Sequence, residues 1–394
     1  MVTPKLRFKE FDSAWSNSKI DDIAVVTSGG TPSRSNLTFW DGNIPWVTTS
    51  LVDFNIIQSA EEFITQKGLD NSSAKLFPKN TILMAMYGQG ITRGKVAILG
   101  IDATTNQACA AIKLQSNYDT QFIFQNLMNR YEEIRDLSND GGQKNLSAGI
   151  IKEIEVNYPE KTEQTKIATF LSAVDEKIAQ LSQKLHLLGQ YKQGMMQKLF
   201  SQQIRFKADD GSDFWEWEET QLISISEIIM GSSPKSENYN ENSIGLPLLQ
   251  GNADIKNRKS APRLYTSEIT KTCDINDILL SVRAPVGFVA VSKHIACIGR
   301  GLCSIRAKNE YSQDFLYQWL LNHEKLWVSL SQGSTFDSVN SEQIKKLCIL
   351  VPCLEEQTKI ANFLSTIDKK MDVVSEQLKQ TKTWKKGLLQ QMFV

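Results

Sequence analysis

The stretch 88–95, which reads Gly-Gln-Gly-Ile-Thr-Arg-Gly-Lys, is the part of the chain that most resembles a motif with known chemistry. Glycine-rich loops of this kind can hold phosphate groups through their backbone amides. The stretch misses the dinucleotide pattern G-x-G-x-x-G by one residue, and Val96 stands where a phosphate-binding loop needs Ser or Thr. The corresponding stretch in the second half, 283–289, has lost most of its glycines. We therefore do not expect a nucleotide site.

Side chains that could bind a metal or act as nucleophiles are scattered along the chain. None of the six cysteines belongs to a C-x-x-C pair, and no histidine is spaced with cysteines or carboxylates as a metal ligand. A methyltransferase would need a polar-Pro-Pro-aromatic motif, and none occurs. No repeated cluster of carboxylates with a lysine suggests a nuclease, and no nucleophile elbow is present. We expect no catalytic residue, no metal site and buried free thiols at Cys109, Cys273, Cys297, Cys303, Cys348 and Cys353.

Composition sets broad limits on the class of protein. The 394 residues carry 44 basic and 44 acidic side chains, so the formal net charge is zero. Neutrality argues against a simple basic nucleic-acid-binding protein but leaves room for a local basic groove. No run of about 18 apolar residues suggests a membrane span, and the N-terminus lacks the apolar segment of a signal peptide. A cytoplasmic location is therefore expected.

One sequence occurs twice and indicates how the chain is organised. Residues 163–172 read E-Q-T-K-I-A-T-F-L-S, and residues 356–365 differ from them at one position. Each copy begins a helical pattern, and the two patterns end in similar sequences at 192–200 and 385–393. Short apolar runs and Gly-Pro turns before each copy also correspond, including the turns at 29–33 and 231–235. A repeat with this period predicts two equivalent units, roughly 1–200 and 201–394.

Apolar residues in both copies follow the alternating 4, 3 spacing of a coiled coil. A helix over 163–200 would be roughly 57 Å long, which suits a spacer better than a small core. The alternative is that the two helices are amphipathic and pack separately on their own domains. The shared register favours contact between the copies. The predicted seam consists of Ile167, Leu171, Val174, Ile178, Leu181, Leu185, Leu188, Ile360, Leu364, Ile367, Met371, Val374 and Leu378.

Two divergent domains, each followed by a near-identical long helix, form a recognisable plan. Over its whole length the chain resembles the specificity subunit of type I restriction-modification enzymes. The resemblance implies an α+β fold, with two pseudo-repeated target recognition domains of mixed β-sheet and helices, separated by two long antiparallel coiled-coil helices. The implied boundaries are 1–160 for the first domain, 161–200 for the first helix, 201–353 for the second domain and 354–394 for the second helix.

The resemblance also implies a division of labour. The chain would be a non-catalytic subunit whose domains each read one half of a bipartite target in double-stranded DNA. Two methylation subunits and the restriction subunits would be its partners and would carry S-adenosylmethionine, ATP and Mg. No cofactor is expected in this chain. The alternatives are a coiled-coil adaptor without DNA specificity, the recognition subunit of a fused methylase–nuclease system, and an independent methyltransferase.

Polar residues in corresponding loops are the candidates for DNA contact. Arg and Lys can bond guanine edges, and Gln and Asn can bond adenine edges, although each could equally contact a phosphate or nothing. The candidates are Thr31, Ser33, Arg34, Tyr87, Gln89, Arg93, Lys95, Gln143 and Lys144 in the first unit, and Lys235, Gln250, Asn252, Arg283, Arg300, Ser334 and Thr335 in the second. Outward-facing helix residues that recur in both copies are expected to dock the methylation subunits. These are Lys166, Lys192, Gln197, Lys359, Lys385 and Gln390.

Overall fold

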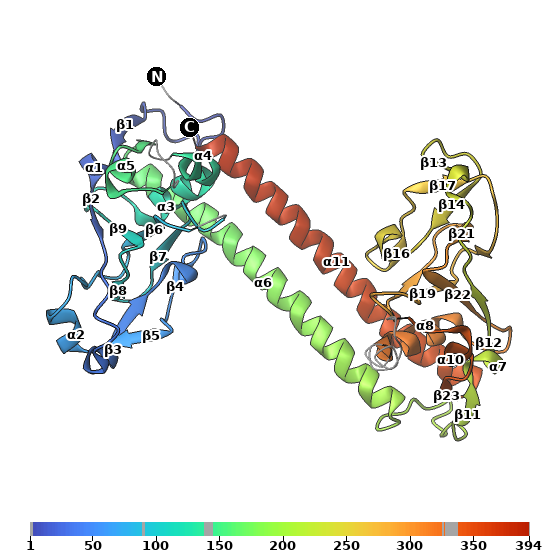
Figure 1. The fold of residues 1–394 in the computed structure, drawn as a ribbon. Helices are drawn as coiled ribbons and strands as arrows, with labels where there is room; N and C mark the ends of the chain where they lie inside the picture. The colour runs from blue at the N-terminus through green and yellow to red at the C-terminus, as the bar shows by residue number, and fades with distance from the viewer. Residues whose placement is uncertain (1–2, 89–90, 138–144, 325–326, 328–337, 394) are drawn as a thin grey trace. The chain divides into compact units, whose positions relative to one another are not determined.

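The chain forms two compact units in the computed structural model (Figure 1). Unit 1 consists of Met1–Ser182 with Gln377–Val394, and unit 2 consists of Gln183–Glu376. The structure describes all residues except 1–2, 89–90, 138–144, 325–326, 328–337 and 394. Two long helices, α6 (Lys161–Phe200) and α11 (Leu354–Met392), contribute to both units.

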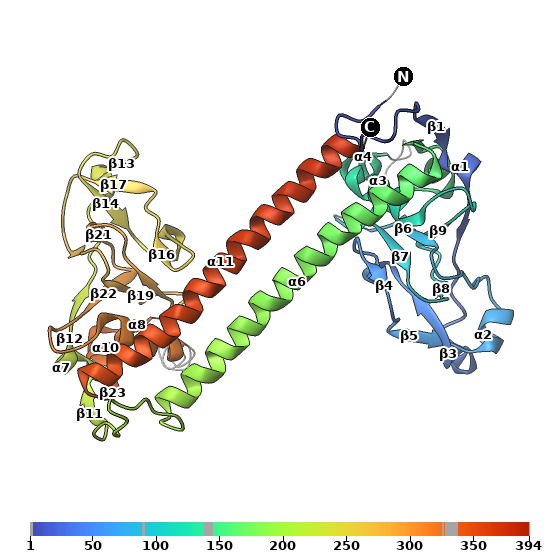
Figure 2. The same ribbon diagram turned by 180° about the vertical axis from the view of Figure 1, so that it is seen from behind.

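Unit 1 is built on a five-stranded sheet, one face of which packs against α6 (Figure 2). The strand order is β2 (Ala24–Ser28), β9 (Cys109–Leu114), β6 (Ile82–Ala85), β7 (Val96–Leu99) and β4 (Ile56–Ile57). A second sheet holds β5 (Glu62–Ile64), β3 (Trp40–Val47) and β8 (Thr104–Thr105), and β1 (Ser16–Lys19) pairs with β10 (Glu155–Tyr158). The helices are α1 (Ile20–Ile23), α2 (Gln66–Asp70), α3 (Thr120–Asn129), α4 (Tyr131–Asp136) and α5 (Ala148–Lys152), with 3-10 turns η1 (Leu37–Phe39) and η2 (Thr49–Leu51).

Unit 2 repeats this plan with extra strands. Its main sheet runs β12 (Ser226–Met230), β22 (Leu302–Ala307), β19 (Ile278–Ser281), β20 (Val289–Val291), β16 (Lys259–Ser260) and β15 (Ile255–Lys256). Its second sheet runs β13 (Tyr239–Asn240), β17 (Leu264–Thr266), β14 (Leu246–Leu249), β21 (Ala296–Ile298) and β18 (Thr272–Cys273), and β11 (Glu218–Gln221) pairs with β23 (Cys348–Val351). The short helices are α7 (Leu222–Ile225), η3 (Ser236–Asn238), η4 (Asn252–Asp254), α8 (Gln313–Asn322) and α10 (Ser341–Lys345).

Alternating side chains of each main sheet enter two different cores. In unit 1, Ile82 and Met84 face a core shared with α3 and both long helices, whereas Leu83 and Ala85 face a smaller core with Val47. In unit 2 the same alternation separates Ile278 from Leu279. Because both faces are buried, the strands read as continuous apolar runs.

The long helices pack on each other within each unit. In unit 1 the first turns of α6 and the last turns of α11 share one core, which includes Leu171 and Leu388. In unit 2 the last turns of α6 and the first turns of α11 share another, which includes Leu199 and Ile360. The pairing is therefore antiparallel, and the two helices do not pack separately on their own domains. Every residue of the predicted seam is buried or half-buried.

The duplicated decapeptide attaches each domain to its helix. Arg7 forms two bonds of 2.8 and 2.7 Å with Glu163, and Arg205 forms bonds of 3.3 and 2.9 Å with Glu356. Both carboxylates are fully buried (0% exposed). Each glutamate thus clamps the segment that precedes its domain onto the first turn of its long helix.

The glutamine that follows each glutamate makes a second attachment. Gln164 Oε1 accepts from the Asp119 N–H at 2.9 Å, and Gln357 Oε1 accepts from the Ser312 N–H at 2.8 Å. Asp119 and Ser312 are the N-caps of α3 and α8. The amide of each glutamine also donates to the carbonyl of the proline five residues earlier. The strict duplication therefore reflects identical joints between helix and domain.

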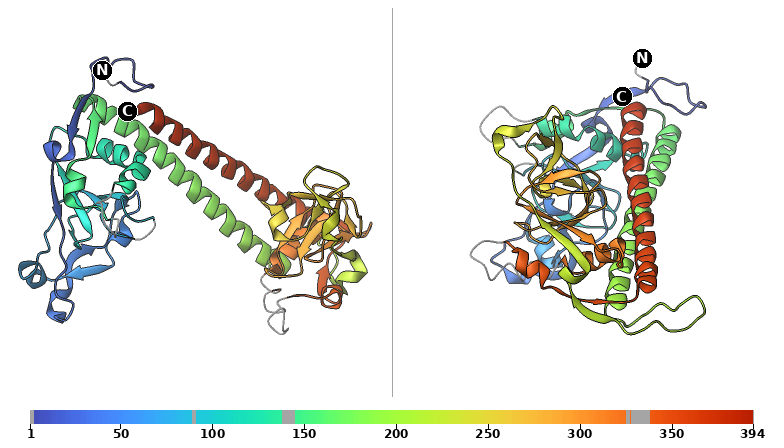
Figure 3. Two further views of the ribbon diagram at one scale, coloured as in Figure 1. Left: turned by 45° about the horizontal axis from the view of Figure 1, so that its top comes forward. Right: turned by 90° about the vertical axis from the view of Figure 1, so that its right-hand side faces the viewer.

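A backbone hydrogen bond near the start of each domain is also repeated in the two units. The Leu6 N–H donates to the Gln391 carbonyl at 2.9 Å, and in unit 2 the Ile204 N–H donates to the Lys198 carbonyl at 3.2 Å. Figure 3 shows the segment before β1 near the last turn of α11 in unit 1. The segment that precedes the first domain thus contacts the end of α11 in the same way that the segment that precedes the second domain contacts the end of α6.

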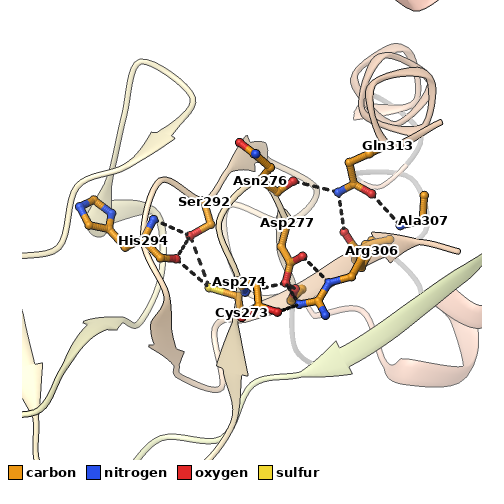
Figure 4. A network of polar contacts seen from close by, with 11 residues as sticks. Cys273, Asp274, Asn276, Asp277, Ser292, His294, Arg306, Ala307 and Gln313 are labelled. Carbon is orange, nitrogen blue, oxygen red and sulfur yellow. Dashed lines mark hydrogen bonds and ion pairs between the residues drawn. The ribbon is translucent and has the colours of Figure 1, made fainter. Parts of the chain in front are cut away.

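A polar network around Asp277 connects several strands of unit 2 (Figure 4). The side chain of Asp277 is 3% exposed and accepts two bonds from Arg306 at 2.7 and 2.8 Å. It also accepts from the Asp274 N–H at 2.8 Å and the Ser304 hydroxyl at 2.7 Å. Burial alone would raise the pKa of Asp277, but these hydrogen bonds outweigh burial and lower it.

We predict that Asp277→Asn destabilises unit 2 at neutral pH and reduces its acid sensitivity. Because the folded pKa of Asp277 is lowered, its contribution to stability is present above the ordinary aspartate pKa of about 3.9 and is lost as pH falls below it. Thermal unfolding between pH 3 and 7 checks this. Asp274→Asn is the matched control, since Asp274 meets the same Arg306 but is 54% exposed. Equal pH profiles for both variants would contradict the prediction.

Candidate nucleic-acid interface

Four loops converge at one end of the sheets in unit 2. The Gly299 N–H donates to the Leu249 carbonyl at 2.8 Å, and the Ser232 N–H donates to the Ile298 carbonyl at 2.9 Å. The Val282 N–H donates to the Gly301 carbonyl at 2.9 Å. These bonds join the segments 231–235, 249–252, 282–287 and 299–301, which we call the unit 2 loop cluster.

Unit 1 contains the same arrangement with the same backbone bonds. The Asn106 N–H donates to the Val47 carbonyl at 3.0 Å, the Gly30 N–H donates to the Thr105 carbonyl at 2.8 Å, and the Met86 N–H donates to the Ala108 carbonyl at 2.8 Å. The joined segments are 29–34, 47–50, 86–88 and 105–108, which we call the unit 1 loop cluster. The two clusters are structural equivalents on different sequences.

The first glycine of each turn is required by close backbone approach. A Cβ atom at Gly29 would lie 2.1 Å from Thr105 Oγ1, and one at Gly231 would lie 2.2 Å from the Gly299 carbonyl oxygen. No larger residue fits at such distances without moving backbone. These glycines hold the turns against the neighbouring loops.

Candidate residues of the first turn differ in their availability. The Thr31 hydroxyl donates to Gln107 Oε1, and Ser33 bonds Ser35 at 2.9 Å. Tyr87, which leaves β6, is 42% exposed. These side chains lie on the segments of the unit 1 loop cluster, where a ligand could meet them.

Arg34 is occupied by its own neighbours. Its Nη2 donates to Glu62 Oε2 at 2.9 Å, its Nη1 bonds the other carboxylate oxygen, and its guanidinium lies 3.8 Å from the Trp40 ring centroid. The hydrogen bonds from Arg34 lower the pKa of Glu62. These contacts hold the turn against β3, and the Arg34 side chain is 54% exposed.

Arg93 and Lys95 are also engaged within unit 1. Arg93 Nε donates to the Arg135 carbonyl at 3.0 Å. Lys95 Nζ lies 2.6 Å from Asp53 Oδ1, and the Lys95 side chain is only 15% exposed. These contacts connect the β6–β7 hairpin with α4 and with the turn before β4, and they do not place either side chain in the loop cluster.

In unit 2 the structure brings most of the described candidates together. Asn252 Nδ2 donates to the Pro285 carbonyl at 3.3 Å, and the Gln250 N–H donates to Asp254 at 2.8 Å. Lys235 is 75% exposed, with Nζ 3.9 Å from Glu237. Arg283 and Arg300 are exposed in the same cluster. The candidates Gln89, Gln143, Lys144, Ser334 and Thr335 lie outside the described residues.

The equivalence of the clusters reveals residues that sequence reasoning missed. Gln107 in unit 1 stands at the place of Arg300 in unit 2, which is 193 positions later in the sequence. Thr48 and Ser50, whose hydroxyls are 2.6 Å apart, stand at the places of Gln250 and Asn252. The offset of 193 positions that relates the two long helices also relates Gln107 to Arg300, so Gln107 could have been identified from the sequence.

The docking candidates are placed differently from the sequence expectation. Lys192 does not face outward, because its Nζ lies 2.7 Å from Asp368 and its side chain is 12% exposed. Lys385 does not face outward either, since it lies 2.5 Å from Asp175 and is 15% exposed. Both lysines instead connect one long helix to the other.

The remaining docking candidates fall into two kinds. Lys166 pairs with Glu10, and Lys359 lies 2.6 Å from Asp209, so these lysines help to hold the segments that precede the domains. Gln197 and Gln390 are exposed. The repetition of the four lysines is thus accounted for by contacts within each unit.

Comparison with protein families decides the class of this molecule. Residues 12–188 and 215–382 each match the family described as the type I restriction modification DNA specificity domain. The chain belongs to this family. It carries two specificity domains, and the predicted fold class is confirmed.

Curated relatives agree with this assignment. A putative type I restriction enzyme MjaX specificity subunit from Methanocaldococcus jannaschii is 34% identical over 255 residues, which cover 63% of this chain and 60% of the relative. The chain thus spans about 60% of that relative's length. The type I restriction enzyme MjaVIII specificity subunit from the same organism is 21% identical over 95% of this chain and 91% of its own length.

A solved structure shows the same fold. The S subunit of a type I restriction-modification system from M. genitalium matches with a TM-score of 0.67 at 19% identity, covering 100% of this chain and 99% of that chain. The chain therefore shares its fold with that S subunit at low sequence identity.

Proposed function

We propose that this chain is the DNA specificity subunit of a type I restriction-modification complex. In this proposal 1–160 and 201–353 are target recognition domains, and each reads one half of a bipartite sequence in double-stranded DNA. The observation that carries it is the pair of loop clusters, which share backbone bonds and differ in side chains. A common scaffold with different exposed polar groups is what two readers of different half-sites require, because base edges are distinguished by donors and acceptors.

The long helices, 161–200 and 354–394 in the proposal, connect the readers and set the half-site spacing. Readers on a rigid connection impose a geometric separation on their half-sites. Two methylation subunits bind the helices, with Gln197 and Gln390 as the best candidates for contact, since both are exposed at corresponding positions.

Catalysis belongs to the partner subunits in this proposal. The methylation subunits bring S-adenosylmethionine, and the restriction subunits bring ATP and Mg. Among the described residues, no group of three or more His, Cys, Asp or Glu side chains is placed to hold a metal ion.

In the described part of the chain, no helix has the length and apolar character needed to cross a membrane. The complex would act on DNA in the cytoplasm.

Methylation mapping tests the proposal directly. The full chain is co-expressed with its methylation partner, and methylated adenines in the host genome are mapped by sequencing. We expect one bipartite motif with a fixed spacing. Replacing residues 1–155 by the corresponding domain of another family member should change one half-site and leave the other unchanged.

Two results would contradict the proposal. An undivided motif, or a change in both half-sites after the exchange, would show that the domains do not read separately. Absence of any sequence-dependent methylation, with the complex intact, would favour an adaptor that binds proteins only.

A further inference from the structure

Two side-chain positions in each loop cluster are equivalent but chemically different. In unit 1 they hold Tyr87 and Gln107, and in unit 2 they hold Arg283 and Arg300. In unit 1 the N–H of Met86, which precedes Tyr87, donates to the carbonyl of Ala108, which follows Gln107, at 2.8 Å. In unit 2 the N–H of Val282 donates in the same way to the carbonyl of Gly301 at 2.9 Å. The two positions are therefore neighbours in each cluster, on equivalent backbone.

The arginines of unit 2 are available to a ligand. Both residues are exposed, and neither guanidinium bonds another described residue. The backbone N–H of Arg300 donates to Ser233 Oγ at 3.1 Å, which fixes its loop without using the side chain. An arginine whose guanidinium is not bonded by described neighbours can present its donors in a fork.

The nearby carboxylates of unit 2 are engaged elsewhere. Asp254 is buried, accepts from the Gln250 N–H at 2.8 Å and pairs with Arg263 at 3.0 Å. Glu268 accepts from the Lys235 N–H at 2.9 Å and from Asn238 at 2.8 Å. Neither is bonded to Arg283 or Arg300, so the positive charge of the arginine pair stays available.

Unit 1 carries uncharged side chains at these positions. Gln107 is exposed and accepts from the Thr31 hydroxyl through Oε1, which leaves its amide group to donate and a second lone pair on Oε1 to accept. Tyr87 contributes a phenol, and the residue as a whole is 42% exposed. The arginine of this cluster, Arg34, is paired with Glu62. The unit 1 loop cluster therefore offers neutral amide and hydroxyl groups where the unit 2 loop cluster offers two cations.

We propose that Arg283 and Arg300 read guanine in the half-site of unit 2, and that Gln107 with Tyr87 reads an A·T pair at the corresponding place in the half-site of unit 1. Arginine bonds guanine O6 and N7 with two parallel donors, and glutamine pairs with adenine N6 and N7 in the major groove. The inference rests on the proposed function, because it assigns base classes to the same loop clusters.

The test exchanges the side chains between the clusters. The full chain carrying Arg283→Tyr and Arg300→Gln is co-expressed with the methylation partner, and genomic methylation is mapped and compared with the unchanged protein. We expect one half-site to lose its requirement for a G·C pair, with methylation of the original site falling about ten-fold or more. The other half-site stays the same. Lys256→Gln, an exposed change in the same unit, is the control and should leave the motif intact.

The single variants and the reverse exchange sharpen the result. Arg300→Gln alone should relax one base position, and Gln107→Arg in unit 1 should create a preference for guanine in the other half-site. Thermal unfolding of each variant ensures that the domains remain folded. A variant that fails to fold is replaced by Arg300→Met, which keeps most of the side-chain length and removes every donor, so that it should also relax the guanine requirement.

The outcomes separate this inference from the proposed function. A bipartite motif that neither exchange alters would overturn the base assignment and leave the specificity subunit standing. A uniform loss of methylation at all sequences would indicate phosphate contacts and would overturn it as well. A motif without two separate halves would reject the proposed function itself.

Discussion

Replacing Glu163 by glutamine is expected to destabilise unit 1 by about 3 kcal/mol or more, because breaking a buried ion pair leaves its partner charge uncompensated. The carboxylate is 0% exposed, and Arg7, its partner, is 13% exposed. Glutamine has nearly the same shape but can accept only one of the two bonds that Arg7 donates. The loss should reach the whole unit, since Arg7 holds the segment before the domain to α6.

Hydrogen exchange of the full chain measures this effect in each unit separately. Peptides from β9 and α3 should lose protection in Glu163→Gln, whereas peptides from unit 2 should keep theirs. Lys177→Gln, an exposed change on the same helix, is the control and should alter neither. Unchanged protection of β9 in Glu163→Gln would contradict the role assigned to the ion pair.

The equivalent change in unit 2 should cost more. Glu356 accepts a further bond of 3.1 Å from Trp217 Nε1, whereas Trp15 Nε1, its counterpart in unit 1, has no partner among the described residues. A hydrogen bond to a charged group contributes about 1.5–3 kcal/mol. Glu356→Gln should therefore reduce the protection of unit 2 more than Glu163→Gln reduces that of unit 1.

The periodic parts of the fold could be predicted from sequence because their signal is local. Apolar residues at 4, 3 spacing indicated both long helices, and bounded apolar runs indicated strands such as β6 and β19. The boundary between α3 and α4 could not be predicted in this way, since it arises where Arg130 leaves the helical conformation at φ −96°, ψ 17°. A single turn of the backbone leaves no trace in hydrophobic periodicity.

The placement of charged side chains could not be predicted, because their partners are distant in sequence. Lys192 was expected to face outward, but Asp368, 176 positions away, holds it. Arg34 was a candidate for DNA contact, and Glu62, 28 positions away, pairs with it. The repeat offset relates one copy to the other and says nothing about pairs formed between the copies. Only three-dimensional contact distinguishes Arg34 from Arg283 and Arg300, whose guanidinium groups bond no other described residue.

Lengthening both long helices by one heptad is the change with the largest expected effect on the proposed function. Seven residues inserted after Gln183 in α6 and seven inserted after Glu376 in α11 keep the apolar seam in register, because seven residues are one full repeat. The added length is about 10 Å at 1.5 Å per residue, so the half-site spacing should grow by about three base pairs. The half-sites themselves should stay the same.

Four residues inserted near Gln183 alone should act differently. A four-residue insertion shifts the heptad pattern and leaves α6 without a matching extension of α11, so we expect an altered or poorly defined spacing and weaker methylation. Seven residues inserted after Gly211, a turn where an added Cβ would meet nothing within 4 Å, provide the control and should leave the spacing intact. Methylation mapping reads all three variants in the same way. If the double heptad insertion folds and the spacing does not change, the helices do not set it, and the separation must come from the partner subunits.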